Sequence, residues 1–188
     1  FEKIMIVTGG NSAGDFLRLL GNGRDFGLRD IYYTYQQGEG GIADALKLCE
    51  NFADGEPVCV ILGDNIFEDD ISPYVERFRA QGGGARLLLK EVHDPQRFGV
   101  PEIEGGRIVR IDEKPAVPKS TYAVTGIYLY DARVFEFCRQ LTPSARGELE
   151  ITDVNNAYIA AGDMHYDILN GWWTDAGQIE SLFYAASL

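Results

Sequence analysis

The sequence predicts a three-layer α/β/α protein with a mostly parallel sheet, folded as one domain of 188 residues. Strand-like and helix-like segments alternate through the first half of the chain. Residues 58–62 are all apolar between a proline and a glycine, which is typical of a strand buried on both faces of a parallel sheet. Residues 100–103 and 107–111 flank a Gly-Gly pair and indicate an inserted β-hairpin.

The side-chain pattern predicts each element of the first half in turn. Residues 4–7 form a short apolar strand, and residues 15–20 form a short helix that a Gly-Asn-Gly sequence ends. Residues 31–36 are rich in Tyr and Thr, which favours a strand. Apolar residues at helical spacing indicate an amphipathic helix from 42 to 52. Ser72, as a cap, and the proline after it begin the next helix.

The same patterns predict the second half, where apolar runs indicate strands and helically spaced apolar residues indicate helices. The 22 glycines fit the many tight turns that such short elements require. Strands are expected at 85–92, 123–130 and 166–169, and helices at 134–141, 152–161 and 178–188.

Composition and charge exclude several classes of protein. Seventeen basic and 29 acidic residues give a net charge of −12, which argues against a general nucleic-acid binder and against adhesion to anionic membranes. No apolar run approaches the roughly 20 residues of a membrane helix. Three cysteines without close spacing exclude a disulfide framework and a zinc ribbon. A phosphorylated substrate would therefore need a local cluster of cationic groups or a divalent cation.

Two aspartates are candidate metal ligands. Asp64 comes after the apolar run 58–62, at the end of a strand where ligands bind in open α/β sheets. Asp175 follows Trp172-Trp173-Thr174 and precedes an Ala-Gly pair and the last helix. Each also has an ordinary structural role open to it, as the cap of a turn or helix. If the two converge, their carboxylates suit one Mg²⁺ that bridges phosphate oxygens, and we expect them within about 6 Å of each other.

Candidate ligands for a sugar phosphate follow the hairpin. Lys114 is a compact cation suited to a phosphate, and Glu113 could accept hydrogen bonds from sugar hydroxyls. A solvated strand end is equally open for both residues. Arg146, in a polar loop before a helix, could clamp a phosphate with two hydrogen bonds, or could pair with Glu148 or Glu150.

Two glycine-rich stretches differ in what they can bind. Residues 9–15 have the outer glycines of a P-loop but an Asp where Lys is required, and they also lack the dinucleotide spacing, so both motifs are excluded. Residues 38–41 lie before a helix whose N-terminus could meet an anion or a base. Gln36, just before them, carries an amide that could pair with a nucleobase edge, although an ordinary strand-end amide is the simpler interpretation.

Six motifs occur in one order along the chain, at 62–67 (LGDNIF), 94–100 (DPQRFGV), 113–115 (EKP), 122–128 (YAVTGIY), 144–153 (SARGELEITD) and 173–177 (WTDAG). In this combination the chain closely resembles the sugar-1-phosphate nucleotidylyltransferases, and within them the glucose-1-phosphate thymidylyltransferase branch. The resemblance implies a nucleotide-binding, Rossmann-like sheet whose inserted hairpin serves the sugar site. It also implies a cytoplasmic, Mg²⁺-dependent, homo-oligomeric enzyme that makes a nucleotide-sugar and pyrophosphate from dTTP and glucose 1-phosphate.

The resemblance also implies a role for individual residues. Asp64 and Asp175 would hold the metal, and Lys114 and Arg146 would hold the sugar phosphate, with Lys114, Arg146 and Asp64 as the catalytic residues. The sugar pocket would be lined by Gly99, Glu113, Val124 and Tyr128, and the thymine base would meet Gln36 and Gly41.

The N-terminus departs from this family. The family begins with a strand and a glycine-rich loop that carries an Arg and then a Pro-Lys pair, and nothing like it occurs at Phe1. We therefore expect residues 1–188 to be a catalytic domain that is incomplete at its N-terminus and inactive alone. Two alternatives stay open: a nucleotide-sugar-dependent glycosyltransferase, and a sugar-nucleotide-binding or regulatory homologue without catalysis. Against the first, Asp64-Asn65-Ile66 does not have two aspartates one residue apart.

Overall fold

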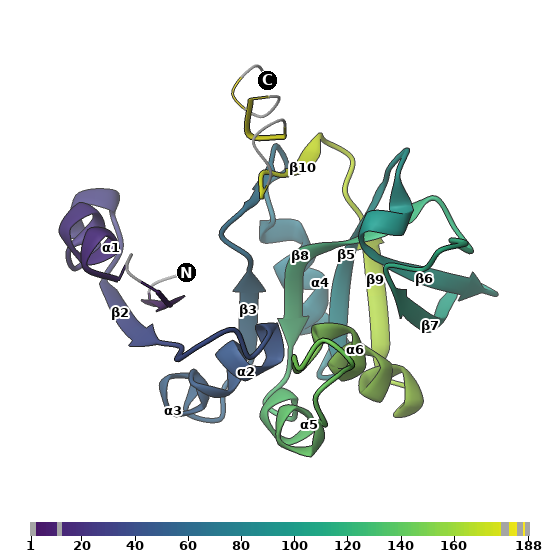
Figure 1. Cartoon of the computed structure of the whole chain (residues 1–188), viewed down its shortest axis with the longest axis horizontal. Coiled ribbons are helices and arrows are strands. Elements are labelled where there is room, and N and C mark those ends of the chain that lie inside the picture. The colour runs from purple at the N-terminus through teal and green to yellow at the C-terminus, as the bar shows by residue number, and fades with distance from the viewer. Residues whose placement is uncertain (1–2, 11–12, 178–180, 184–185, 187–188) are drawn as a thin grey trace. The chain divides into compact units, whose positions relative to one another are not determined.

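The computed structural model describes residues 3–10, 13–177, 181–183 and 186. The chain forms two compact units (Figure 1). The first comprises Phe1–Glu56 with Val134–Val154, and the second comprises Pro57–Arg133 with Asn155–Leu188. In the described part of the chain, no helix is long and apolar enough to cross a membrane. The predicted helix at 178–188 lies largely outside the described residues.

The first unit pairs a small parallel sheet with short helices. Its strands β1 and β2 run parallel in register from Lys3↔Asp30 to Thr8↔Tyr35. Helix α2 packs against α5, and both bury apolar side chains. The elements are β1 (Lys3–Thr8), α1 (Ala13–Leu20), a 3₁₀ turn (Arg24–Phe26), β2 (Asp30–Tyr35), α2 (Ile42–Lys47), α3 (Glu50–Ala53), α5 (Val134–Gln140) and the start of α6 (Ile151–Ala160).

The helix predicted over 42–52 is interrupted. Leu48 and Cys49 donate to carbonyls three residues back, at Ala45 and Leu46, so the chain tightens for one turn between α2 and α3. Among the residues at the predicted apolar spacing, Leu46 and Cys49 are nevertheless buried, and Ile42, Ala45 and Phe52 are partly buried. The apolar spacing therefore predicted the buried side correctly but could not show the change in backbone hydrogen bonding.

The second unit is built on a four-stranded sheet in the order β3-β8-β5-β9 (Figure 1). Strand β8 runs antiparallel to both β3 and β5, and β5 runs parallel to β9. The strands are β3 (Val58–Ile61), β5 (Ala85–Glu91), β8 (Tyr122–Tyr130) and β9 (Met164–Ile168). In the pairings described, the sheet is thus mixed rather than mostly parallel.

The run 58–62 does not form a strand between parallel neighbours, as the sequence predicted. Strand β3 is at the edge of the four-stranded sheet, is only half-buried, and leaves Ile61 43% exposed. Strand β8 instead is buried along its length after Tyr122. The prediction was wrong because an apolar run can form a partly buried strand as well as a fully buried one. The run also contains no information on the direction of the neighbouring strand.

Helices cover both faces of this sheet, which confirms the layered α/β class. Ile127 and Leu129 of β8 cluster with the aromatic side chains of α4 (Ser72–Gln81). Tyr130 takes part in packing on the opposite face, because its ring stacks on that of Tyr158 in α6 at 5.5 Å. The order of layers in this unit is therefore α4, sheet, α6.

The inserted hairpin is present. Strands β6 (Gly99–Glu104) and β7 (Arg107–Glu113) pair antiparallel through a two-residue turn. Gly105 and Gly106 both have positive φ, 55° and 76°, as a type I′ turn requires. That the hairpin serves a sugar site stays a prediction.

Sequence patterns did not reveal one strand pair. β4 (Asn65–Phe67) and β10 (Trp173–Asp175) pair antiparallel, with Asp175 opposite Asn65. Three residues are too few to show the two-residue period that marks a strand. The start of α4 also differs from the prediction that Ser72 caps this helix. The capping oxygen belongs to Asp70, whose Oδ1 accepts a hydrogen bond from the Ser72 N–H at 2.9 Å.

Asp69 fixes the chain that leads into β10. Its carboxylate accepts hydrogen bonds from the Tyr74 hydroxyl at 2.6 Å and from the backbone N–H groups of Asn170 at 3.0 Å and Gly171 at 2.5 Å. Burial alone would raise the pKa of Asp69, but these three donors together lower it below its usual value.

We expect Asp69→Asn to lower the free energy of unfolding by about 1–3 kcal/mol, because an amide cannot accept all three bonds and presents its own N–H to a donor. Since the folded pKa of Asp69 is depressed, its contribution is complete above the ordinary pKa and is lost as pH falls through the folded value. Urea unfolding of the wild type should therefore show a steeper loss of stability in acid than the variant. Tyr74→Phe, which removes one donor, should give a smaller effect. Identical acid profiles for wild type and Asp69→Asn would contradict this account.

Candidate functional site

The β4–β10 pair brings Asp64 and Asp175 together. The Ala176 N–H donates to the Asp64 carbonyl at 2.7 Å, which ties the segment after β10 to the residue before β4. A Cβ built on Gly177 would lie 2.9 Å from Asp175 Oδ1 and 3.2 Å from Asp64 Oδ2. These two oxygens are therefore no more than about 6 Å apart, the limit that the sequence predicted. The predicted convergence is confirmed, whereas the metal role of the two residues stays a prediction.

Each carboxylate is held by one hydrogen bond. Asp64 Oδ1 accepts from Asn65 Nδ2 at 2.9 Å, and Asp175 Oδ1 accepts from the Gly177 N–H at 2.8 Å. Among the described residues, no group of three or more His, Cys, Asp or Glu side chains is arranged to hold a metal ion. The donor set nevertheless fits Mg²⁺, which commonly takes one or two carboxylates and completes its shell with water and substrate phosphates.

The hairpin places a second set of predicted residues together. Gly99, at the start of β6, pairs with Glu113, at the end of β7. The next residue, Lys114, donates its backbone N–H to the Phe98 carbonyl at 3.0 Å. Lys114 has φ of 45°, a left-handed conformation that costs a non-glycine residue free energy. The backbone therefore turns sharply where the Lys114 side chain leaves the hairpin.

Tyr128 relates the hairpin to the aspartate pair. Its side chain is buried in β8, and burial raises the pKa of its hydroxyl, with further increases from the negative charges of Glu113 and Asp64. The Tyr128 hydroxyl therefore stays protonated and remains a hydrogen-bond donor throughout the neutral range. Val124 pairs with Leu89 beside a register irregularity between β5 and β8, a feature that is common next to active sites.

The remaining predicted residues belong to the first unit. Gln36 Nε2 donates to the Gly41 carbonyl at 3.0 Å and to Asp44 Oδ2 at 3.1 Å, so these two predicted base ligands are adjacent. The bond from Gln36, followed by that from Lys47, lowers the pKa of Asp44. Gly41 has φ of 91°, and a Cβ there would lie 2.6 Å from the Leu149 carbonyl oxygen. Only glycine fits this position without strain.

Arg146 is engaged with acidic neighbours. Its guanidinium donates to both carboxylate oxygens of Glu150, at 3.1 and 2.8 Å, and lies 3.7 Å from Glu148. The ion pair weighed as an alternative is therefore what this structure shows. The phosphate-binding role of Arg146 stays a prediction.

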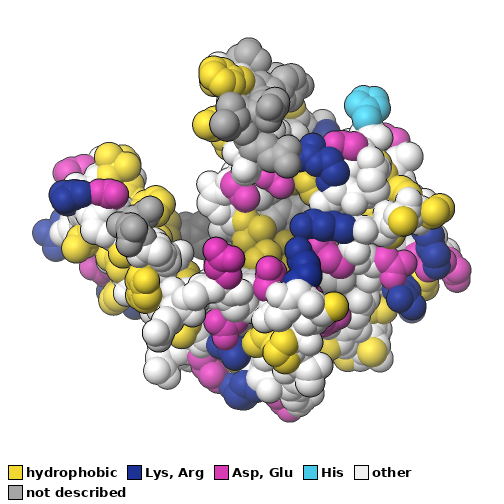
Figure 2. Space-filling view, in the orientation of Figure 1, with side chains coloured by type: hydrophobic (Ala, Val, Ile, Leu, Met, Phe, Trp, Pro, Cys, Tyr) yellow, Lys and Arg dark blue, Asp and Glu magenta, His cyan; other side chains and the backbone are white. Residues whose placement is uncertain are grey.

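Charged side chains of both signs are interspersed on the face seen in Figure 2. Several arginines form close ion pairs, such as Arg77 with Asp167 at 2.7 Å and Arg133 with Asp163 at 2.8 Å. Lys114 differs, because its ammonium is 4.0 Å from Glu113 and its side chain is 53% exposed. Lys114 is thus an exposed cation without a close ion pair to Glu113, in a chain of net charge −12. Such a side chain can bind an anion without first breaking a short salt bridge.

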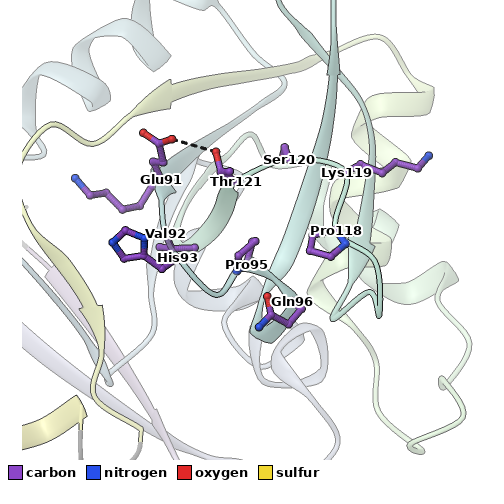
Figure 3. A pocket seen from close by; sticks show the side chains of 10 residues that line it. Glu91, Val92, His93, Pro95, Gln96, Pro118, Lys119, Ser120 and Thr121 are labelled. Carbon is purple, nitrogen blue, oxygen red and sulfur yellow. Dashed lines mark hydrogen bonds between the residues drawn. The ribbon is translucent and has the colours of Figure 1, made fainter.

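An open groove of about 800 Å³ lies elsewhere in the second unit, between the end of β5 and the segment before β8 (Figure 3). Figure 3 shows the Glu91–Thr121 hydrogen bond, 3.1 Å long, across the end of these two segments. The groove is large enough for a small ligand, but none of the predicted site residues lines it. The groove therefore does not coincide with the predicted site.

Asn65 and Trp173 were given no role from the sequence. The Trp173 indole N–H donates to Asn65 Oδ1 at 2.7 Å, and its ring meets that of Phe98 at 5.3 Å. Both residues occur inside the ordered motifs, which was a signal that they are close to the site. The contacts themselves join segments that the sequence does not show to be neighbours.

The aspartate pair leaves no room for a side chain at Gly177. We expect Gly177→Ala to weaken Mn²⁺ binding at least about tenfold, because its methyl group would enter the space between the two carboxylates while the ends of those side chains move aside. Electron paramagnetic resonance of the unbound Mn²⁺ ion measures this. Gly63→Ala is the matched control, since it adds the same methyl next to Asp64 in open space. Equal Mn²⁺ affinity in both variants would argue against a cation between Asp64 and Asp175.

The chain is similar to known proteins along nearly its whole length. The chain is 45% identical over 190 residues to a glucose-1-phosphate thymidylyltransferase of Neisseria meningitidis, covering 99% of this chain and 66% of that protein. It is 45% identical over 182 residues to the enzyme of that name from an Actinoplanes species, covering 95% and 59%. The chain therefore spans about two thirds of the length of these relatives, or somewhat less.

Solved structures share the fold. A Bacillus anthracis protein assigned as a glucose-1-phosphate thymidylyltransferase, crystallised with sucrose, superposes with a TM-score of 0.92 at 54% identity over 97% of this chain and 74% of that one. UDP-glucose pyrophosphorylase bound to UDP-glucose superposes with a TM-score of 0.85 at 22% identity, which shows a shared fold. The family description "Nucleotidyl transferase" matches residues 1–188. The chain thus belongs to the nucleotidyl transferase family.

Proposed function

We propose that this chain is the catalytic core of an enzyme that transfers a thymidylyl group from dTTP to glucose 1-phosphate. The observation that carries the proposal is the convergence, in one unit, of the aspartate pair with Tyr128 and the Glu113–Lys114 corner. These groups come from separate segments, and the resemblance assigns each of them a role in holding the metal or the sugar phosphate. The names of the most similar proteins support the same substrates.

The chemistry requires positioning more than proton transfer. A phosphate oxygen of the sugar phosphate attacks the α-phosphorus of the triphosphate, a new P–O bond forms, the bond to the β-phosphate bridging oxygen breaks, and pyrophosphate leaves. Asp64 and Asp175 would hold Mg²⁺, which when bound neutralises phosphate charge. Lys114 and Arg146 would hold the sugar phosphate by charge, and no covalent enzyme intermediate is needed.

Recognition of the two substrates would be divided among the other predicted residues. Glu113 would accept hydrogen bonds from sugar hydroxyls, and Tyr128 would donate one, since its hydroxyl stays protonated. Gly99 and Val124 would complete the sugar pocket, and Gln36 with Gly41 would meet the thymine base. For Arg146 to hold a phosphate, its guanidinium would exchange Glu150 for the substrate. We further propose a cytoplasmic homo-oligomer, as the resemblance implies.

Pyrophosphate release separates this function from its two alternatives. The natural full-length protein should release pyrophosphate only when dTTP, glucose 1-phosphate and Mg²⁺ are all present. A glycosyltransferase would instead consume a nucleotide-sugar and release a nucleoside phosphate. A regulatory homologue would bind nucleotide-sugar without turnover, and either result would overturn the proposal.

Lys114→Met tests the phosphate-binding role most directly. The substitution keeps most of the side-chain length and removes the charge, so we expect kcat/KM to fall by about a hundredfold, or about 3 kcal/mol, as for loss of one preorganised donor. Stability should change by less than about 0.5 kcal/mol, because the side chain is largely exposed. Lys119→Met, which removes another exposed lysine of the second unit, is the control and should retain wild-type turnover. An unchanged kcat/KM in Lys114→Met would contradict the phosphate-binding role of Lys114.

A further inference from the structure

Asn65 stands at the centre of a hydrogen-bond network that joins three strands of the second unit. Its Oδ1 accepts the Gly126 N–H of β8 at 2.8 Å and the Trp173 indole N–H of β10 at 2.7 Å. Its Nδ2 donates to Asp64 Oδ1 at 2.9 Å. The side chain is partly buried, and its bonds to Gly126 and Trp173 are partly shielded from water, whereas its bond to Asp64 is exposed.

These partners determine which way the amide faces. Both Gly126 and Trp173 present N–H groups, which can donate and cannot accept, so only the carbonyl oxygen of Asn65 can face them. The NH₂ group is thereby directed to Asp64, whose carboxylate can only accept. The orientation of the Asn65 amide follows from the chemistry of its neighbours, and Trp173 acts on Asp64 through Asn65.

The backbone leaves room for this arrangement. A Cβ on Gly126 would lie 2.4 Å from Asn65 Nδ2 and 2.7 Å from its Cγ, so any other residue there would displace the amide. The Gly126 carbonyl also accepts the Leu62 N–H at 2.8 Å, which holds the chain two residues before Asp64. The glycine in β8 is thus part of the support for Asp64.

The same network reaches the hairpin. The Trp173 ring packs edge-on against Phe98 at an interplanar angle of 66°, and the Phe98 carbonyl accepts the Lys114 N–H. Trp173 therefore contacts the predicted sugar-phosphate side through its ring and the predicted metal side through its N–H.

We propose that Asn65 is a positioning residue for Asp64: held by Gly126 and Trp173, its amide fixes one carboxylate oxygen and turns the other toward Asp175. Asp64 Oδ1 is occupied by Asn65, while Oδ2 is the oxygen that lies near Gly177 and Asp175 Oδ1. The inference rests on the proposed function only in taking Asp64 as a cation ligand. Partners of this kind around metal ligands typically contribute 10- to 100-fold to metal affinity or activity.

Mn²⁺ alone is the probe, followed by electron paramagnetic resonance in the natural full-length protein, with thermal unfolding measured in parallel. Asn65→Ser should weaken Mn²⁺ binding at least about tenfold and raise the Mg²⁺ concentration needed for half-maximal pyrophosphate release. Asn156→Ser is the control, because Asn156 likewise uses both its amide oxygen and its amide nitrogen, bonded to the N–H and the carbonyl of Ile111. That control should lose stability to a similar degree and keep the Mn²⁺ affinity of the wild type.

Trp173→Phe tests the second step of the network and keeps the aromatic contact with Phe98. It should weaken Mn²⁺ binding by several-fold, whereas Trp172→Phe should not. Because Trp173 acts through Asn65, adding Trp173→Phe to Asn65→Ser should cause no further loss of Mn²⁺ affinity. Additive losses in the double variant would overturn this ordering.

Asp64→Asn is the reference that distinguishes the two proposals. If Asp64→Asn weakens Mn²⁺ binding while Asn65→Ser lowers only the unfolding temperature, Asn65 is structural and the positioning proposal fails alone. If Asp64→Asn leaves Mn²⁺ binding unchanged, the metal role of Asp64 and the positioning proposal fail together. If Asn65→Ser does not fold, the Mn²⁺ affinity of Trp173→Phe decides instead: an affinity equal to that of the wild type overturns the positioning proposal.

Discussion

The short antiparallel pairing of β4 with β10 is the constraint on which the candidate site depends. It places Asp175 opposite Asn65 and the Ala176 N–H on the Asp64 carbonyl, so two carboxylates distant in sequence become neighbours. A three-residue pair is weak by itself. Hydrogen bonds between the residues that follow β4 and those that precede β10 therefore set its register. Asp69 accepts the N–H groups of Asn170 and Gly171, and the Glu68 N–H donates to the Trp172 carbonyl.

The rest of the second unit supports that pair. Strand β8 is buried along nearly its whole length and provides Gly126, whose N–H donates to Asn65, and Tyr128, whose pKa the charges of Glu113 and Asp64 help to raise. The hairpin ends in Lys114 with a left-handed backbone, a local cost that the surrounding packing must offset. Rigid strands thus present the charged groups, and their ends carry the side chains that would meet phosphate. This arrangement suits a reaction in which electrostatic positioning is the main contribution of the protein.

Local patterns in the sequence predicted most of the elements to within a few residues. The hairpin followed from Gly105-Gly106, because only residues that tolerate positive φ fit its turn, and β5 and β8 followed from long apolar runs. The antiparallel course of β8 against β3 could not be predicted, since strand direction depends on pairing and not on composition. The break after α2 was also not predicted, because the same apolar spacing continues through Cys49 and Phe52.

For the site, the sequence by itself determined which chemical groups are available. Asp64, Asp175, Glu113 and Lys114 have side chains of the kinds that bind cations, sugars or phosphates, and for Asp64, Glu113 and Lys114 the sequence also predicts a place at or just after a strand end. The tertiary structure alone decided how they are held. Asn65 meets Gly126 and Trp173, which are 61 and 108 positions away, and the direction of its amide is fixed only when both N–H groups face it. A hydrogen-bond network of this kind produces no periodic pattern in the sequence, because its members are distant along the chain. They become partners only when packing brings their donors and acceptors together.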